Sequence, residues 1–236
     1  MNLFYISDLK GTSAWFDPEE TRHCFKVFRH RMGDELQATD GLGFWYRLRL
    51  RKLVGERAEL EVLSKEKGGG EHTGEIVLAV SPLRLPDRFE WLLEKAVELG
   101  ANRIVPIISE RTVKTVLRVE RLNKIMIAAM KQSCRSMLPE LDSPLPLENF
   151  LAEKSDGLKI AGFCGATEVI SHSIPQINLS TSFRILIGPE GDFTNEEVEN
   201  IKLAGYSILS FGEARLRTET AAIFALSVIK GLKSWG

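Results

Sequence analysis

The sequence is poor in the residues that build disulfide frameworks and metal centres, with only three cysteines and four histidines in 236 residues. Cys24, Cys134 and Cys164 are odd in number, lie far apart and form no Cys-x-x-Cys pair. The histidines show no metal-ligand spacing either. We therefore predict neither disulfide bonds nor a metal site.

Long apolar runs are also missing. The longest one near the C-terminal end, 221–229, is shorter than the roughly 20 residues that a membrane helix needs. The first residues have no basic region, and Asp8 interrupts them, which is not the pattern of a secretory signal. We therefore expect a cytoplasmic protein with no membrane partner. An apolar fraction of 44%, with unremarkable glycine and proline, excludes a disordered or collagen-like chain.

An excess of one charge sign is missing too, because 31 Lys and Arg residues face 32 Asp and Glu residues, for a formal net charge of −1. This balance excludes a uniformly basic nucleic-acid binder. Residues 22–52, however, carry eight basic against three acidic groups, and residues 84–135 carry eleven against six. Residues 136–212 carry four basic and eleven acidic groups. The neutral total is thus a cancellation between segments, and local positive clusters remain that suit a phosphate backbone.

The first part of the chain is predicted to be rich in β-strands. Short alternating runs at 35–40, 44–53 and 57–63 are separated by Asp40-Gly41 and by Gly55. The flexible run Lys67-Gly-Gly-Gly70 follows, and the pattern changes after it. We therefore expect a domain boundary near 68–73, with one domain at 1–70 and a second at 71–236.

Two interpretations are open for the basic run Arg47, Arg49 and Arg51 in the predicted hairpin. The run could contact phosphates, or it could be neutralised across the strands on a solvated face. A three-residue loop at 54–56 favours the second interpretation. The expected cross-strand pairs are Leu50–Leu60, Leu48–Val62, Arg51–Glu59 and Arg49–Glu61. Four basic residues without nearby acidic partners are better candidates for contact with a polyanion: Arg22, Lys26, Arg29 and Arg31.

From Glu75 onward, predicted strands and helices alternate, which indicates an α/β fold with a mainly parallel sheet covered on both faces. The expected strands are 76–80, 103–108, 159–163, 183–187 and 206–210. The expected helices are 86–100, 119–137, 194–205 and 218–232. Capping boxes are predicted for Asp87 with Glu90 and for Thr194 with Glu197. The apolar last helix could be core or a dimer contact.

Three of these strands end in segments that suit a ligand, and ligands of open α/β sheets bind at the carboxyl ends of strands. The segments are Gly162-Phe-Cys-Gly165, Ile187-Gly-Pro-Glu-Gly-Asp-Phe193 and Leu209-Ser-Phe-Gly-Glu-Ala-Arg-Leu-Arg-Thr-Glu-Thr220. Glycine lets the backbone approach a ligand closely. The sequence contains neither a dinucleotide-binding nor a Walker A motif. Either loop alone could simply shape a turn, but two such loops in one chain favour a ligand site.

These segments resemble the 16S ribosomal RNA (uracil-N3) methyltransferases of the SPOUT superfamily. The resemblance rests on Ile187–Gly191 with Phe193-Thr194, and on Phe211-Gly212 with Arg215–Ala221. Shorter matches support it in order along the chain: His23–Arg29, Gly33-Asp34, Glu98-Leu-Gly100, Pro106, Ser109-Glu-Arg111 and Gln132-Ser-Cys-Arg135. Asp192 departs from the family pattern, which usually has glycine there, and so does Glu213-Ala214.

The resemblance implies an N-terminal PUA-like, RNA-binding β-barrel and a C-terminal α/β domain with a trefoil knot that holds S-adenosylmethionine. It also implies a homodimer that acts on the small ribosomal subunit. The residues implied to bind the cofactor are Phe163, Gly165, Ile187, Gly188, Pro189, Glu190, Gly191, Leu209, Phe211, Gly212 and Leu216.

Methylation of uracil N3 requires that the N3 proton leaves, so the site needs a base or a cation that stabilises the uracil anion. We expect Arg217, Arg111 and Arg135 to be candidates for the cation or for gripping the adjacent phosphate. Glu190 or Glu219 could instead accept the proton. A surface ion pair is the alternative account of each arginine.

Two rival functions remain open at this point. Another SPOUT enzyme, such as a 2′-O-ribose methyltransferase, would activate a hydroxyl group instead of a base nitrogen. A non-catalytic RNA-binding protein would use the β-domain alone. His23 could contact RNA, although a half-buried structural histidine is the simpler interpretation.

Overall fold

The computed structural model describes residues 2–68 and 74–234. Its contacts divide the chain into two compact units. The first unit contains the residues up to 71 together with 127–138, and the second contains 72–126 and the chain from 139 onward. Most of the boundary expected at 68–73 lies outside the described residues. Residues 127–138 were not expected to pack with the first unit.

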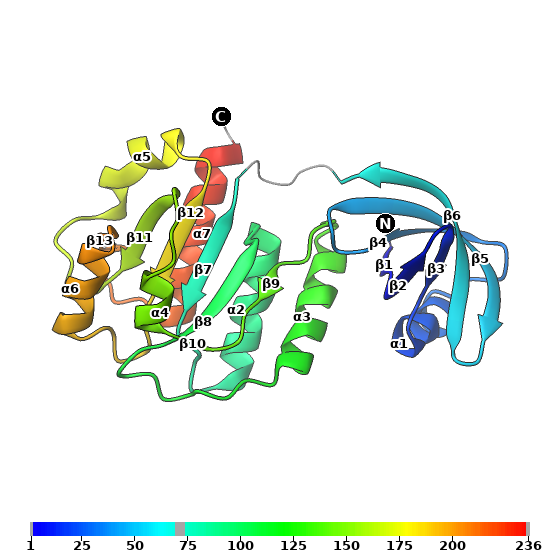
Figure 1. The fold of residues 1–236 in the computed structure, drawn as a ribbon, viewed down its shortest axis with the longest axis horizontal. Helices are drawn as coiled ribbons and strands as arrows, with labels where there is room; N and C mark the ends of the chain where they lie inside the picture. Colours follow the sequence, from blue (N-terminus) through cyan, green and yellow to red (C-terminus); the bar gives the residue numbers. More distant parts are fainter. Residues whose placement is uncertain (1, 69–73, 235–236) are drawn as a thin grey trace. The chain divides into compact units, whose positions relative to one another are not determined.

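The first unit is a curled six-stranded sheet whose strands follow the order β1-β4-β5-β6-β3-β2 (Figure 1). The strands are β1 (Leu3–Tyr5), β2 (Asp8–Lys10), β3 (Ser13–Trp15), β4 (Glu35–Thr39), β5 (Phe44–Val54) and β6 (Arg57–Lys67). The first three were not expected, because three-residue strands are too short to show an alternating pattern. Side chains from β1 and β3–β6 converge on one core around Phe4, Phe16 and Leu48. Within residues 2–68, β1 and β2 are the two edge strands and do not pair with each other, so the sheet is open there.

The β5–β6 hairpin agrees with the predicted register near its middle and departs from it near the turn. Leu50 pairs with Leu60 as expected, and so do the Leu48–Val62 and Arg49–Glu61 pairs. The prediction of a three-residue loop is wrong: Val54 pairs with Arg57, and Gly55 at φ 61° begins a two-residue turn. An irregularity between Leu50 and Lys52 compensates for the shorter loop, so that Lys52 rather than Arg51 lies opposite Glu59.

Cross-strand neutralisation is what the hairpin shows for its basic run. Arg49 donates to Glu35 at 2.7 Å, and Arg51 pairs with Glu61. The Arg47 guanidinium lies 3.8 Å from Glu35 as well. Arg49 and Arg47 also lower the pKa of the Glu35 carboxyl, chiefly through the hydrogen bond from Arg49.

The second unit is built on a parallel sheet, which confirms the predicted α/β class. Its central order is β8-β7-β12-β11-β13, and all of these pairs are parallel. The strands are β7 (Ile76–Val80), β8 (Arg103–Ile108), β9 (Glu140–Leu141), β10 (Leu145–Pro146), β11 (Leu158–Gly162), β12 (Phe183–Ile187) and β13 (Ser207–Leu209). The residues of β7 and β12 are buried throughout, as in strands covered on both faces.

Helices cover both faces of this sheet (Figure 1). α2 (Pro86–Leu99) and α7 (Thr218–Ser234) pack against each other, and α7 also contacts β7 and β12. On the other face, α4 (Leu147–Leu151) and α6 (Asn195–Leu203) contribute Phe150 and Ile201 to a core with Val77 and Leu186. The remaining helices are α1 (Pro18–Arg22), α3 (Val119–Gln132), α5 (Ile174–Leu179) and the 3₁₀ turn Ile170–Ser173.

Two local predictions for the helix ends need correction. Asp87 does not cap α2, because Leu85 occupies the N-cap and Pro86 is the first helical residue. The helix expected at 119–137 ends at Gln132. Cys134 adopts φ 53°, and the N–H of Arg135 donates to the Met130 carbonyl at 3.0 Å, which is a Schellman ending. The capping box of Thr194 and Glu197 is confirmed.

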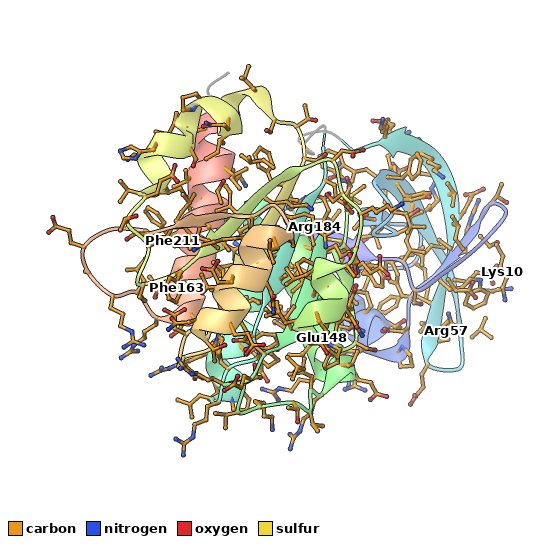
Figure 2. The ribbon with its side chains drawn as sticks, turned by 60° about the vertical axis from the view of Figure 1, so that its left-hand side comes forward. Lys10, Arg57, Glu148, Phe163, Arg184 and Phe211 are labelled. Atoms are coloured by element: carbon orange, nitrogen blue, oxygen red, sulfur yellow. The ribbon has the colours of Figure 1, made fainter. Side chains whose placement is uncertain are left out.

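A partly buried ion-pair network lies on the α4 side of the sheet (Figure 2). Arg184, only 4% exposed, extends from β12 with its guanidinium 4.2 Å from the Phe150 ring. It donates to Glu153 at 2.9 Å, and Arg103 donates to the same carboxylate at 2.9 Å. Arg103 also pairs with Asp142 at 2.5 Å. The hydrogen bond from Arg103, with a second from Arg184, lowers the pKa of Glu153 against the opposing effect of burial.

Over the described residues, no helix has both the length and the apolar content that a membrane span requires.

Candidate active site

Three loops meet at one edge of the parallel sheet. They follow β11, β12 and β13, which are neighbours in the order β12-β11-β13, so their carboxyl ends lie side by side. The loops enclose a cavity of about 270 Å³, lined by 162–164, 187–190 with Asp192, and 210–219. The structure therefore brings together the three segments that the sequence singled out, at the edge where open α/β sheets bind ligands.

Two glycines allow aromatic rings to pack against the backbone at the cavity. A Cβ atom on Gly162 would lie 2.7 Å from the Phe211 ring, and one on Gly188 would lie 3.0 Å from the Phe193 ring. Phe211 also stacks obliquely on Phe224 of α7, with ring centroids 5.6 Å apart. Phe163 and Phe211 both line the cavity (Figure 2). Part of the cavity wall is thus aromatic, and side chains larger than hydrogen at 162 and 188 would disturb it.

The loop after β12 is tied to its neighbours by hydrogen bonds. The Glu190 carboxylate accepts the N–H of Arg84 at 3.2 Å, and the Glu190 carbonyl accepts a bond from Arg215 at 3.2 Å. The Thr218 hydroxyl donates to the Gly188 carbonyl at 3.1 Å. These bonds hold the loop against the segment after β7 and against the start of α7.

Asp192 connects two of the three loops. It adopts φ 62°, a left-handed conformation that glycine adopts without strain and most other residues avoid. Its carboxylate accepts a hydrogen bond from the Cys164 N–H at 3.1 Å and another from the N–H of the next residue, Phe193, at 2.9 Å. Partial burial raises the pKa of the Cys164 thiol, and the Asp192 carboxylate adds to this effect. The aspartate thus supplies a link that glycine could not.

Replacing Asp192 by alanine is expected to lower the free energy of unfolding by about 2 kcal/mol. About half comes from the lost hydrogen bond and about half from the strain of a Cβ residue without a side-chain bond at positive φ. Asp192→Asn keeps an acceptor oxygen and tolerates this conformation, so its loss should be smaller by half or more. Urea unfolding measures both, with Asp156→Ala on an exposed loop as the control. Equal losses for alanine and asparagine would refute the link.

The start of α7 adds an ion pair to the cavity, between a buried carboxylate and a partly exposed guanidinium. The Glu219 side chain is 8% exposed, and its carboxylate lies 3.8 Å from the guanidinium of Arg88 on α2. Both residues line the cavity. Glu219 is therefore held by a cation, whereas Glu190 is exposed. Of the two carboxylates considered as proton acceptors, Glu190 is the more accessible.

The three candidate arginines are in different places. Arg217 lines the cavity and is exposed. Arg111 does not line it, but its guanidinium donates to the Gly191 carbonyl at 2.8 Å and so contacts the loop from outside. Arg135 lies in the turn after α3, within the residues that pack with the first unit. The structure thus brings only Arg217 into the cavity wall.

Most of the expected cofactor residues line the cavity. These are Phe163, Ile187, Gly188, Pro189, Glu190, Phe211, Gly212 and Leu216. Gly165, Gly191 and Leu209 are not among the lining residues. Leu209 is fully buried, and its carbonyl accepts the Phe163 N–H at 3.0 Å, so it supports the loop from beneath.

Sequence reasoning missed several lining residues. Cys164, Arg215 and Thr218 lie inside the strand-end segments that the sequence indicated as a ligand site. The glycine-containing sequence around them was therefore the signal that could have identified them. Arg88 lies about 130 residues before its partner Glu219. No local pattern could indicate that pairing, because it depends on how α2 packs against α7.

In the first unit, the four candidate RNA-binding residues Arg22, Lys26, Arg29 and Arg31 are exposed. The segment around them is unusual: His23–Val27 forms a π-helical turn, and Arg29 adopts φ 59°. The His23 ring is half-buried, 4.8 Å from the Phe28 ring. This placement favours the structural interpretation of the histidine.

Comparison with known proteins identifies both units. Residues 71–230 match the RNA methyltransferase domain, and residues 16–63 match the RNA methyltransferase PUA domain. The Ribosomal RNA small subunit methyltransferase E of Mesomycoplasma hyopneumoniae (strain 232) is 32% identical over 184 residues, or 75% of this chain and 79% of the relative.

Solved structures agree. A probable rRNA-methyltransferase from Porphyromonas gingivalis superposes with a TM-score of 0.90 at 31% identity, over 100% of this chain and 99% of that one. A Ribosomal RNA small subunit methyltransferase E from Neisseria gonorrhoeae, bound to S-adenosyl methionine, superposes with a TM-score of 0.85 at 29% identity, over 98% of each chain. Because its RNA methyltransferase domain spans 71–230 behind a PUA domain, and its similarity to such proteins extends over most of its length, this chain belongs to the ribosomal RNA small subunit methyltransferase E family.

Proposed function

We propose that this protein transfers a methyl group from S-adenosylmethionine to N3 of a specific uridine in the 16S ribosomal RNA of the small subunit. The observation that carries the proposal is the convergence of the loops after β11, β12 and β13 around one cavity. The proposal is supported by family membership and by the S-adenosyl methionine bound to the relative from Neisseria gonorrhoeae.

The cavity suits S-adenosylmethionine in its chemistry. Phe163 and Phe211 offer aromatic surface for a purine ring, and the glycine-containing backbone at 187–191 and 210–212 can approach its polar edge. Four carboxylates line the same cavity against three guanidinium groups, so a positively charged sulfonium can lie next to a carboxylate there. When bound, the cofactor supplies a methyl group on a sulfonium centre. Gly165, Gly191 and Leu209 hold the loops in place around it.

The chain's own task is to position uracil and to manage its N3 proton. Arg217 is the side chain proposed to stabilise the negative charge that develops on the base, because it is an exposed cation in the cavity wall. Glu190, an exposed carboxylate that lines the same cavity, is the proposed proton acceptor. Arg111 supports the loop through Gly191, and Arg135 is proposed to grip RNA phosphate.

The PUA unit is proposed to hold the RNA. Arg22, Lys26, Arg29 and Arg31 are the contacts we propose, because all four are exposed and lie in one short segment. Within residues 2–68 and 74–234 none of the four forms a side-chain salt bridge, in contrast to the paired arginines of the hairpin, and only Arg31 lies beside a carboxylate, that of Asp34. A PUA-like barrel character for this curled sheet, and a trefoil knot around the cofactor loops, are further parts of the proposal that rest on the family resemblance.

We propose a homodimer in the cytoplasm, without a metal ion. α2 and α7 pack side by side and present large apolar side chains to solvent: Trp91 is 46% exposed and Phe224 is 36% exposed. Phe224 contacts the cavity-lining Phe211, so this face extends to the active site. Covering such a face by a second copy would shield it from water.

The decisive experiment incubates the protein with S-adenosylmethionine and small ribosomal subunits from a strain that lacks its gene. Mass spectrometry of the digested RNA should place the new methyl group on the base, at N3 of one uridine. A methyl group on ribose would favour the rival 2′-O-methyltransferase. Calorimetry that detects no cofactor binding at millimolar concentration would favour a non-catalytic RNA-binding protein.

A further inference from the structure

We infer that a second cavity, next to the first, binds a nucleotide that flanks the methylated one in the RNA substrate. This inference rests on the proposed function. The second cavity measures about 290 Å³ and is lined by the segment after β7, the first turns of α2, and 114–122 at the start of α3. It belongs wholly to the second unit. We call it the flanking pocket.

The flanking pocket shares a wall with the active-site cavity. In the first turn of α2, Asp87 and Phe89 line the flanking pocket, whereas Arg88 between them lines the active-site cavity. Arg84, next to the pocket residue Leu83, donates its N–H to the active-site residue Glu190 at 3.2 Å. Both cavities therefore open at the same edge of the sheet, within one helical turn of each other. An RNA chain with one nucleotide in the active-site cavity therefore has a neighbouring nucleotide close to the flanking pocket.

The floor of the flanking pocket is apolar. Leu83, Phe89 and Leu122 are 1%, 2% and 4% exposed, and the side chain of Val116 forms part of the wall while remaining 72% exposed. An apolar floor of this kind suits the flat face of a base, which is apolar and gains from leaving water. Inorganic phosphate alone would not use such a surface.

The rim of the flanking pocket is positively charged. Lys114, Arg118 and Arg121 line it against Asp87 and Glu90. Arg121 and Glu90 neutralise each other through two hydrogen bonds of 2.5 and 2.8 Å. Within 2–68 and 74–234, neither Lys114 nor Arg118 forms a salt bridge, so both are available to contact a phosphate. Arg118 also adds to the effect of Arg121 in lowering the pKa of Glu90. Two available cations above an apolar floor match a phosphate attached to a base.

The remaining carboxylate indicates which bases fit. Asp87 is exposed at the pocket, and a carboxylate accepts hydrogen bonds from amino groups and ring N–H groups. It therefore favours a base with such donors, as aspartate and glutamate do with the cytosine amino group. Sequence-specific RNA recognition commonly holds unstacked bases in this manner. The charged rim favours RNA over a second copy of this chain as the occupant.

The test compares Lys114→Ala/Arg118→Ala with the control Lys154→Ala/Lys202→Ala. The control removes the same two positive charges from exposed residues away from both cavities. Lys154 precedes β11, and Lys202 lies in the last turn of α6. Filter binding with unmodified 16S ribosomal RNA should give about a tenfold higher Kd for the pocket variant, and a salt slope reduced by about 2. Its Kd for S-adenosylmethionine should be unchanged. RNA affinity equal to that of the control would overturn the inference.

A second arm tests the base itself. RNA substrates with one abasic nucleotide at each position around the target should show one flanking position at which KM rises for the wild type. Asp87→Ala should abolish that increase and leave the other positions unaffected. If no flanking position has this property, the pocket does not bind a base.

Sedimentation velocity separates the rival occupant. A change of oligomeric state in the Lys114→Ala/Arg118→Ala variant, with RNA affinity unchanged, would assign the pocket to an interface between copies and overturn the inference. Failure of the proposed function is recognised separately. The wild type would then leave small subunits unmethylated, while the comparison of RNA affinities would still decide on the flanking pocket.

Discussion

Replacing Arg217 by alanine is expected to reduce kcat for methyl transfer to small ribosomal subunits by about 10²–10³-fold, the loss typical of removing one group that stabilises developing charge. The physical reason is that uracil N3 becomes nucleophilic only when its proton leaves, and Arg217 is an exposed cation in the cavity wall, whereas Arg215 donates to the Glu190 carbonyl. Calorimetry should show that affinity for S-adenosylmethionine largely survives. The measurement is single-turnover transfer, which isolates chemistry from product release.

Arg217→Lys provides the matched control. Lysine retains the charge without the planar fork, so a partial recovery of kcat is expected if charge is what the base requires. If Arg217→Lys is as slow as Arg217→Ala, the planar geometry of the guanidinium matters and charge alone is not sufficient. Full activity of Arg217→Ala would remove this residue from the mechanism.

Replacing Glu153 by glutamine is expected to lower the free energy of unfolding by about 3 kcal/mol, because breaking a buried ion pair leaves an uncompensated charge. Arg184 is only 4% exposed and has Glu153 as its carboxylate partner at 2.9 Å. Arg103 retains Asp142, so the cost falls mainly on Arg184. Urea unfolding at pH 7 gives the loss. Glu148→Gln, an exposed site on the adjacent α4, should change stability by less than about 0.5 kcal/mol.

The same variant has a defined pH dependence. The pKa of Glu153 is lowered in the folded protein, so its ionisation contributes stability that is present above its ordinary pKa of 4.5. That contribution is lost as the pH falls through the lowered folded-state pKa. The difference between wild type and Glu153→Gln should therefore be constant near neutrality and shrink below pH 4.5. A difference that does not change with pH would show that the charge of Glu153 is not what stabilises Arg184.

Much of the second unit was predictable because its strands are buried on both faces. The apolar run 76–80 and the run 183–187, which is apolar except for Arg184, are short and rich in β-branched or aromatic residues, which favours strands over helices. Both were found with the expected bounds. The helix at 119–137 was predicted too long because its apolar spacing continues past Gln132. The left-handed conformation of Cys134 ends it, and no side-chain pattern signals that conformation in a cysteine.

The hairpin shows how a local choice alters a register. The pairs near its middle depend on which side chains avoid water, and these were predicted correctly. The turn length depends on the backbone at Gly55, and the irregularity after Leu50 compensates for it. Arg51 consequently pairs with Glu61 rather than with Glu59. The predicted neutralisation of the basic run was therefore correct, but the predicted partner of Arg51 was wrong.

The candidate site shows the same difference between local features, which the sequence predicts, and contacts between distant residues, which it does not. Strand-end loops rich in glycine were visible in the sequence because chemistry at a sheet edge needs specific local residues, and these loops do line one cavity. The pairing of Arg88 with Glu219, and the assignment of Arg135 to the first unit, depend on which elements pack together. Local sequence thus determined the elements and the loops, since these follow from periodicity and turn chemistry. Tertiary packing alone decided which distant side chains meet, because such contacts form between residues that share no local pattern.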